Sequence, residues 1–330
     1  MDFSEWIDLA SERLGGAVLY VNDDFFAPKE NLLKPAKPVF IEGRYTDAGK
    51  WMDGWETRRR RTPGFDWCIV QLGVPGILRG LRVDTSHFKG NYPEHCSLDA
   101  CALDGQPSLK AVMSEAAQWT EILPKSGLRG DAENDFTIGF PRRVTHLRFK
   151  IFPDGGVARL RAYGEASPDW NVLARGGGEV DLAAVENGGR VLACSDMFFG
   201  SRQNLIMPGR GADMGDGWET RRRRGPGHDW AILKLGTRGV IRRVVVDTAH
   251  FKGNFPESFS LEAANIAGTP QDPVAAAVPW SEIIARTKLE ADKRHFLDRE
   301  IRQAGGTTHV RFNIYPDGGV SRLRIFGSIA

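Results

Sequence analysis

The sequence predicts a mainly β protein built from two tandem β-sandwich or jelly-roll domains. Its length, its content of turn-forming residues and an internal repeat lead to this prediction. At 330 residues the chain is too long for one ordinary domain and suits two domains of about 150–170 residues. The 38 glycines and 18 prolines indicate many turns, which favours short strands over long helices.

Three sequence blocks occur twice, and the second copy of each begins 163 positions after the first. They are DGWETRRRR from Asp53, VDT(S/A)HFKGN from Val83, and THLRFKIFPDGGVARLRAYG from Thr145, which returns as THVRFNIYPDGGVSRLRIFG. A fixed separation preserves the order and spacing of the blocks. The chain is therefore predicted to be one domain duplicated in tandem.

The beginnings of the two copies match with a different separation. GGAVLYVNDDFF from Gly15 resembles GGRVLACSDMFF from Gly188, so the first copy contains ten additional residues within Lys34–Met52. That stretch is rich in proline, glycine and charge and predicts a loop insertion. The segment Glu165–Val180 predicts the linker, which gives domains at residues 1–168 and 169–330.

The two copies differ mainly in apolar positions. Residues 68–82 match their counterparts at 5 of 15 positions, whereas the fifteen residues from Asp53 match at 13 of 15. Apolar exchanges are expected where a core tolerates repacking. Packing alone does not require charged residues to stay the same, so the shared polar blocks are the candidates for function.

Between the polar blocks the residue pattern predicts strands. Trp67–Leu72 and Leu78–Val83 are short, aliphatic and bounded by Gly and Pro. The Asp-Gly-Gly sequence within Phe152–Val157 predicts a hairpin turn, followed by a strand with alternating side chains. Helix is predicted only in small pieces, such as Gln118–Leu123 and the longer Ser281–Leu297, where a serine offers an N-cap.

Composition and charge exclude several classes of protein. The 44 basic and 42 acidic residues leave a net charge of +2, which predicts neither a nucleic-acid nor a membrane partner. The first residues lack the apolar run of a secretory signal, and no apolar stretch approaches about 18 residues. The four cysteines show neither metal-ligand spacing nor a disulfide framework. We therefore expect a soluble protein of the cytoplasm.

The duplicated arginine run predicts either a binding site for an anion or an interface. In an extended run alternate side chains face opposite ways, so about two of the four arginines could converge on a ligand. The planar guanidinium of arginine suits a small carboxylate. The alternatives are a solvated charged edge and contacts with a neighbouring subunit. The candidate ligand-binding arginines are Arg58, Arg60, Arg221 and Arg223.

Tryptophan and glutamate flank the arginine run in both copies. Trp55 and Trp218 are predicted to belong to the core or its rim, with the lining of a pocket as the alternative. Glu56 and Glu219 are candidates for a general acid or base, with charge pairing to arginine as the alternative.

The second block places acidic, basic and amide side chains in a loop after a strand. His87 and His250 are the candidates for proton transfer, because imidazole changes protonation close to neutral pH. The accompanying candidates for substrate binding are Asp84, Lys89 and Asn91 and their counterparts Asp247, Lys252 and Asn254. For His146 and His309, which begin an apolar strand, we favour a structural role. The third block offers further cations, with exposed residues of a strand as the alternative interpretation: Arg159, Arg161, Arg322 and Arg324.

These three blocks, each present twice, resemble the allantoicase repeat over nearly the whole chain. The resemblance implies two tandem jelly rolls related to galactose-binding-like domains, an oligomeric enzyme, and a place in purine breakdown. The implied reaction is hydrolysis of allantoate to ureidoglycolate and urea. Arginines would hold the carboxylate of allantoate, and Asn, Asp and Glu would bind its ureido groups.

Two alternatives stay open beside this enzyme. One is a non-catalytic ligand-binding module on the same fold, and the other is a role of the polar blocks in subunit assembly. No cofactor motif is present, and a divalent metal ligated from several loops remains an open question. Differences such as Phe65 against His228 predict that the two copies are not chemically identical.

Overall fold

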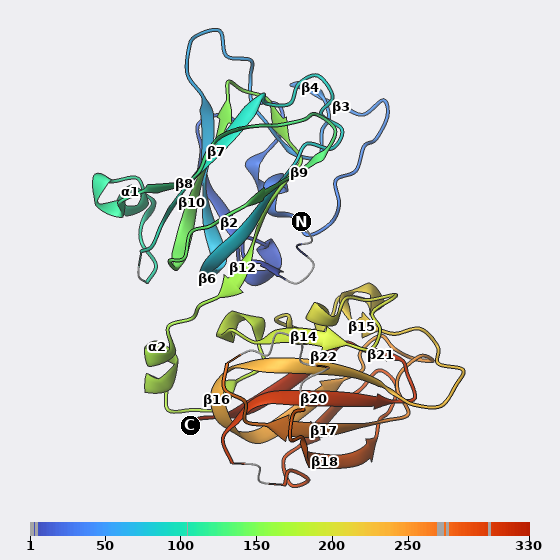
Figure 1. The fold of residues 1–330 in the computed structure, drawn as a ribbon. Coiled ribbons are helices and arrows are strands. Elements are labelled where there is room, and N and C mark those ends of the chain that lie inside the picture. Colours follow the sequence, from blue (N-terminus) through green and yellow to red (C-terminus); the bar gives the residue numbers. More distant parts are fainter. Residues whose placement is uncertain (1–2, 4–5, 104, 269–273, 275–276, 303–304) are drawn as a thin grey trace. The chain divides into compact units, whose positions relative to one another are not determined.

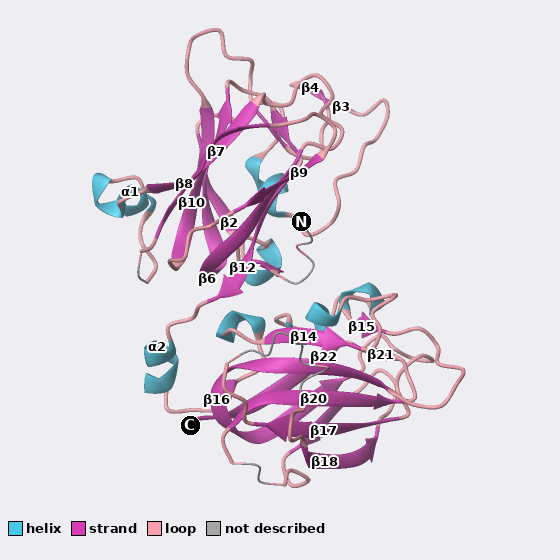
Figure 2. Cartoon of the chain, in the orientation of Figure 1, coloured by secondary structure: helices cyan, strands magenta, loops and turns pink. Residues whose placement is uncertain are grey.

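The computed structural model describes the whole chain except residues 1–2, 4–5, 104, 269–273, 275–276 and 303–304. The chain forms two compact units, residues 1–167 and residues 168–330, which we call repeat 1 and repeat 2. Both consist mainly of strands (Figures 1 and 2). The predicted fold class, a mainly β chain with two tandem sandwich domains, is confirmed.

The elements of repeat 1 are these strands and short helices: β1 (Ile7–Asp8), η1 (Glu12–Leu14), β2 (Ala17–Val21), η2 (Lys29–Leu33), β3 (Tyr45–Thr46), β4 (Gly49–Lys50), β5 (Trp55–Glu56), β6 (Asp66–Asp84), β7 (His95–Cys101), α1 (Leu109–Val112), η3 (Glu115–Ala117), β8 (Thr120–Gly127), β9 (Glu133–Thr137), β10 (Val144–Phe152), β11 (Gly156–Val157) and β12 (Arg159–Ala166).

The elements of repeat 2 follow nearly the same order: α2 (Trp170–Arg175), β13 (Val180–Asp181), η4 (Val185–Asn187), β14 (Arg190–Cys194), η5 (Arg202–Ile206), η6 (Met214–Asp216), β15 (Trp218–Glu219), β16 (Asp229–Asp247), β17 (Ser258–Ala264), β18 (Ser281–Lys288), β19 (Arg294–Leu297), β20 (Thr307–Tyr315), β21 (Gly319–Val320) and β22 (Arg322–Ile329). Helix α2 lies within the segment that the sequence predicts as a linker, and the Asp169 side chain caps its N-terminus.

Each repeat contains one strand of 19 residues, β6 or β16, that pairs with four other strands. The first half of β6 pairs with β10 and β2, and its second half pairs with β12 and β9. Strand β16 pairs in the same way with β20 and β14 and with β22 and β19. Both halves of the sandwich therefore share this strand.

The two short strands predicted at Trp67–Leu72 and Leu78–Val83 are wrong as separate elements, because both belong to β6. The glycines between them do not end the strand, since Gly76 pairs with Val144 of β10 and with Ala166 of β12. From Cys68 to Leu78 every even-numbered residue of β6 is buried. This alternation places one face of the strand in the core.

The predicted hairpin after β10 is also wrong. The residues that follow the Asp-Gly sequence form β11, which pairs with β5 of the distant DGW block and not with β10. Strand β21 pairs with β15 in the same way. Trp55 and Trp218 of β5 and β15 are fully buried, which confirms the predicted core position.

Both predicted helices are strands. Gln118–Leu123 overlaps β8, and Ser281–Leu297 contains β18 and β19. Strand β8 pairs with β7, and β18 pairs with β17. Ile284 of β18 is fully buried. Sheet pairing and burial therefore outweigh the local capping signal of Ser281. No helix in the described ranges is long and apolar enough to cross a membrane.

The interpretation of the third-block arginines as exposed strand residues is wrong for the first arginine of each copy. Arg159 of β12 and Arg322 of β22 are each 2% exposed. Arg159 Nη2 donates to Asp53 Oδ2 at 2.7 Å, and its Nη1 donates to the Asp53 carbonyl at 2.9 Å. Arg322 Nη2 donates to Asp216 Oδ2 at 2.9 Å. A buried guanidinium thus fastens the start of each DGW block to a sandwich strand.

Replacing Arg159 with methionine removes this partner and leaves the buried Asp53 carboxylate with only the Val39 N–H at 3.0 Å and the Lys34 ammonium at 3.8 Å. We expect the free energy of unfolding of repeat 1 to fall by about 3–5 kcal/mol. Guanidinium denaturation read by hydrogen–deuterium exchange mass spectrometry distinguishes peptides of the two repeats and measures this loss. The matched control is Arg61→Met, because Arg61 is exposed and its loss should change stability little. Equal stability of the two variants would contradict the expectation.

Candidate functional site

The three polar blocks of repeat 1 meet at one end of its sandwich. The Asn91 Nδ2 atom donates to Glu56 Oε1 at 2.6 Å, which joins the second block to the first. The Arg60 backbone N–H donates to Asp154 Oδ2 at 2.8 Å, which joins the first block to the third. The Gly156 N–H donates to the Asn91 carbonyl at 2.7 Å, which joins the third block to the second. Blocks far apart in sequence therefore form one loop cluster.

Repeat 2 builds the same cluster from equivalent atoms. Asn254 Nδ2 donates to Glu219 Oε1, and the Arg223 N–H donates to Asp317 Oδ2 at 2.7 Å. The Gly319 N–H donates to the Asn254 carbonyl at 2.8 Å. The duplication has thus preserved the polar contacts as well as the residues.

Two glycines of the third block allow this close approach of loops. Gly155 has φ +134°, and a Cβ there would lie 2.7 Å from the Asn91 carbonyl oxygen. A Cβ on Gly156 would lie 1.9 Å from the fully buried ring of Phe88. Only glycine fits these positions, so the Asp-Gly-Gly sequence serves loop contact here.

The candidate histidines are held in an unusual backbone conformation. His87 has φ 70° and His250 has φ 72°, in the left-handed region that non-glycine residues rarely adopt. The backbone N–H of each donates at 2.8 Å to an aspartate, Asp131 Oδ1 and Asp292 Oδ1 respectively. Strained residues fixed by specific partners occur preferentially at functional sites.

The imidazole contacts define which ring nitrogen is available. His87 Nε2 lies 3.3 Å from the Pro38 carbonyl oxygen, and His250 Nε2 lies 2.8 Å from that of Gly211. A carbonyl oxygen only accepts hydrogen bonds, so Nε2 carries the proton in the neutral ring. The Nδ1 atom then bears the lone pair that can take up a proton.

Glu56 has the environment of a proton donor. Burial raises the pKa of its carboxyl, and the hydrogen bond from Asn91 offsets part of that rise. A raised pKa keeps a larger fraction of the carboxyl protonated near neutral pH. Such a group can protonate a leaving nitrogen.

The candidate arginines are all paired with carboxylates of the protein. Arg58 Nε lies 2.6 Å from Asp23, and Arg221 Nη2 lies 2.9 Å from Asp196. Arg60 Nη1 lies 2.6 Å from Asp66 Oδ1, and Arg223 contacts Asp229 in the same way. These pairs connect the first block to β6, β16 and the loops after β2 and β14.

The remaining predicted residues of the second block lie in the turn that carries the histidine. Asp84 and Asp247 are buried, and each accepts the N–H of the residue two positions later, at 2.8 and 3.0 Å. Lys89 is exposed and lies 3.9 Å from Asp131. Lys252 is also exposed.

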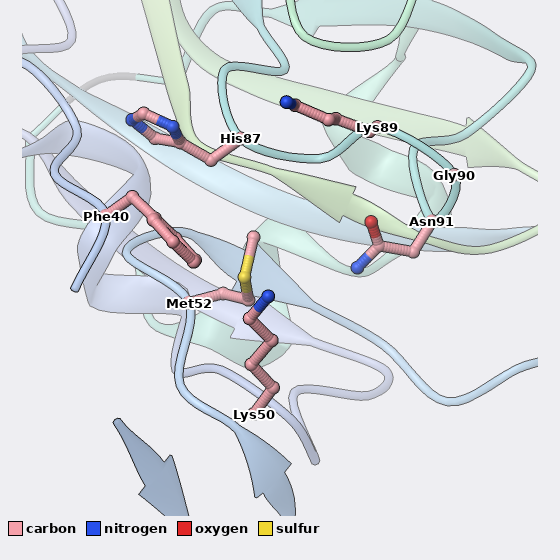
Figure 3. Close-up of a pocket in the computed structure, with 7 residues that line it drawn as sticks. All are labelled: Phe40, Lys50, Met52, His87, Lys89, Gly90 and Asn91. Atoms are coloured by element: carbon pink, nitrogen blue, oxygen red, sulfur yellow. The ribbon is translucent and has the colours of Figure 1, made fainter. Parts of the chain in front are cut away.

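Two pockets of repeat 1 adjoin this cluster, and Gly90 and Asn91 line both. One, of about 380 Å³, is drawn in Figure 3, where Lys50 at the end of β4 and Met52, which follows it, lie opposite His87, Lys89 and Asn91 of the loop after β6. Phe40 completes its lining. The other, of about 580 Å³, includes Glu56, Arg59 and Arg60. Asn91 therefore stands between the candidate base and the candidate acid.

Several residues at this site are absent from the sequence-based prediction. Phe40, Lys50 and Met52 come from the insertion, whose aromatic and basic residues were a usable signal. Asp131 and Asp292 belong to segments where the two copies diverge, so the repeat comparison did not single them out. Their contact with a histidine depends on the three-dimensional structure.

His146 and His309 are buried within their sheets, and each Nδ1 contacts the hydroxyl of the preceding threonine. Burial lowers the pKa of both histidines, to about 4 for His309. They are therefore neutral at physiological pH, which agrees with the predicted structural role.

Among the residues that the structure describes, no three His, Cys, Asp or Glu side chains are grouped so that they could hold a metal ion. Cys68, Cys96, Cys101 and Cys194 are free thiols, and burial raises the pKa of each.

A family model described as the allantoicase repeat matches residues 7–167 and again residues 180–330. The chain belongs to the allantoicase family. The resemblance proposed from the sequence is confirmed by this double match, which covers both repeats.

Relatives in the allantoicase family match almost the whole chain. A probable allantoicase of Burkholderia mallei is 50% identical over 326 residues, 98% of this chain and 95% of the relative. A probable allantoicase of Pseudomonas aeruginosa is 50% identical over 328 residues, 99% of this chain and 97% of the relative. The crystal structure of allantoicase from Saccharomyces cerevisiae is 36% identical, with a TM-score of 0.80 over 98% of this chain and 93% of that one.

The Asn91 hydrogen bond should control the protonation of Glu56. Replacing Asn91 with alanine removes a donor that stabilises the carboxylate, so the pKa of Glu56 should rise further. Carbon-13 NMR titration of labelled glutamate side chains measures the change. Asn254→Ala is the matched control, because it alters the equivalent contact of repeat 2. A Glu56 pKa that is unchanged in Asn91→Ala would contradict the expectation.

Proposed function

We propose that this chain hydrolyses allantoate to ureidoglycolate and urea at the loop cluster of its repeats. Membership of the allantoicase family supports the reaction and does not favour the non-catalytic binding module. The observation that carries the site is the junction of all three polar blocks around Asn91 and Glu56. His87, whose ring contacts the Pro38 carbonyl, lines one pocket together with Asn91.

The reaction needs two proton transfers. Allantoate carries one carboxylate and two ureido groups on a single carbon. One C–N bond breaks and the departing nitrogen takes a proton, while the carbon gains a hydroxyl from water, either directly or after an imine forms. The products, urea and ureidoglycolate, together contain all the atoms of allantoate and water.

The residues of the cluster suit these transfers. Protonated Glu56 donates a proton to the leaving ureido nitrogen, since burial raises its pKa. His87 Nδ1 takes a proton from water or from the remaining ureido N–H, because Nε2 is engaged by the Pro38 carbonyl. Glu219 and His250 are the equivalent pair of repeat 2.

Polar side chains around the pair would position the substrate. Asn91 and Asn254 offer an amide to the ureido groups, and the exposed Lys89 and Lys252 give the loop end a positive field for the carboxylate. The predicted arginines Arg58, Arg60, Arg221 and Arg223 are paired with protein carboxylates and hold the first block in place. Asp84 and Asp247 each accept a backbone N–H of the turn that carries the histidine, and so they help to position the imidazole.

The direct test is incubation of the purified protein with allantoate and measurement of urea and ureidoglycolate. We expect equal amounts of both products. The double variant His87→Ala, His250→Ala should lower kcat by about 10²–10⁴-fold, the usual contribution of a general acid or base. Circular dichroism and thermal unfolding should match the wild-type protein. Normal turnover by the folded double variant would contradict the histidine assignment.

The cellular context is part of the proposal. We infer a cytoplasmic homo-oligomer that acts on a small-molecule substrate, of which the substrate is supported by family membership. We also infer that it has no nucleic-acid partner, which the net charge of +2 supports. Size-exclusion chromatography with light scattering measures the oligomeric state. Repeating it with arginine-run variants tests whether those residues serve assembly.

A further inference from the structure

The two repeats differ most where a loop approaches the candidate histidine. In repeat 1, the fourteen residues 38–51 separate Lys37 from Met52. In repeat 2, the four residues 211–214, with the sequence GADM, separate Arg210 from Gly215. Both loops begin with the carbonyl that anchors the imidazole, so they occupy equivalent starting positions.

The long loop of repeat 1 forms a pocket over the histidine block. The Phe40 ring lies with its centroid 5.8 Å from that of His87. The Lys50 Nζ atom lies 4.6 Å from the Phe40 centroid, a cation–π distance. Figure 3 shows Lys50 extending from its loop toward Met52 and the space faced by Asn91.

The short loop of repeat 2 contacts its histidine block directly. Met214 Sδ lies 3.9 Å from Asn254 Nδ2, so an apolar side chain stands against the amide that the pocket of repeat 1 leaves accessible. Arg210 Nε lies 3.0 Å from Asp247 Oδ2, so the charge of this arginine is compensated by a carboxylate of the protein. The sequence GADM contains neither a basic nor an aromatic residue.

Lys50 differs from the candidate arginines in its electrostatic partners. Each of those arginines is already paired with a protein carboxylate. Within the described part of the chain, no carboxylate lies at ion-pair distance from Lys50, and its interaction is with the face of Phe40. An ammonium group with an uncharged partner can accept a ligand carboxylate without breaking an ion pair.

We propose that Lys50 is a specificity-determining residue of repeat 1, where it binds the substrate carboxylate, and that repeat 1 is the principal site of turnover. The inference rests on the proposed hydrolysis of allantoate. Lys50 holds the carboxylate, Phe40 and Met52 limit solvent on one side of the pocket, and His87 and Asn91 face the ureido groups. Repeat 2 keeps the polar framework without this cation.

The first experiment compares KM and kcat for urea release by Lys50→Met, Lys50→Arg and the control Lys37→Met. Lys37 is an exposed lysine of the same region that does not line the pocket. Loss of a charge-assisted hydrogen bond should raise KM by about 10-fold or more in Lys50→Met. Lys50→Arg should recover most of this loss, and Lys37→Met should leave KM within about twofold of wild type.

The second experiment separates the repeats. If repeat 1 supplies about four-fifths or more of turnover, His87→Ala should lower kcat by about fivefold or more, and His250→Ala should remove only the smaller share of repeat 2, a loss of about 1.3-fold or less. A wild-type KM in Lys50→Met, or equal losses in the two histidine variants, would overturn the inference while wild-type urea release still supports the proposed function. A folded wild-type protein that releases no urea would overturn both.

Discussion

The buried ion pair between Arg159 and Asp53, with its twin between Arg322 and Asp216, is the constraint on which the loop end of each repeat depends. The arginine belongs to a sandwich strand and the aspartate opens the DGW block. Burial would raise the pKa of Asp53, but the hydrogen bond and charge of Arg159 hold it below its usual value. The carboxylate therefore stays ionised, and the start of the block stays attached to β12.

This attachment determines where the polar side chains lie. Once Asp53 is fixed, Trp55 enters the core and its Nε1 donates to the Asp23 carbonyl at 2.8 Å. Glu56 then pairs in register with Gly156, which brings it to Asn91. The arginine run continues outward, where its members bind Asp23 and Asp66. Much of the charge in this run thus stabilises the loop that presents Glu56.

Much of the architecture could be predicted from the sequence, because the duplication, the turn residues and the alternating strands are local signals. The pairing of β11 with β5 could not, since it joins residues about 100 positions apart through glycines whose local signal is a hairpin. The helix predicted from Ser281 failed because its residues complete the edge of a sheet. The burial of Arg159 depends on a carboxylate distant in sequence.

The candidate site was predicted in part. Repetition identified His87, Glu56 and Asn91, because polar residues that stay unchanged while the core diverges stand out. It could not identify Lys50 or Phe40, because an insertion in one copy has no counterpart for comparison. Both copies therefore contain the same histidine, asparagine and glutamate in equivalent positions. They differ in the loop that lies over these residues, which is residues 38–51 in repeat 1 and 211–214 in repeat 2.

A crystal structure of the protein with allantoate, or a non-hydrolysable analogue, bound tests most directly where the substrate lies. We expect density in the pocket of repeat 1, with the carboxylate at Lys50 and a ureido group within hydrogen-bond distance of Asn91 or His87. Ligand bound only away from the loop cluster, with the pocket of repeat 1 empty at saturating concentration, would contradict it.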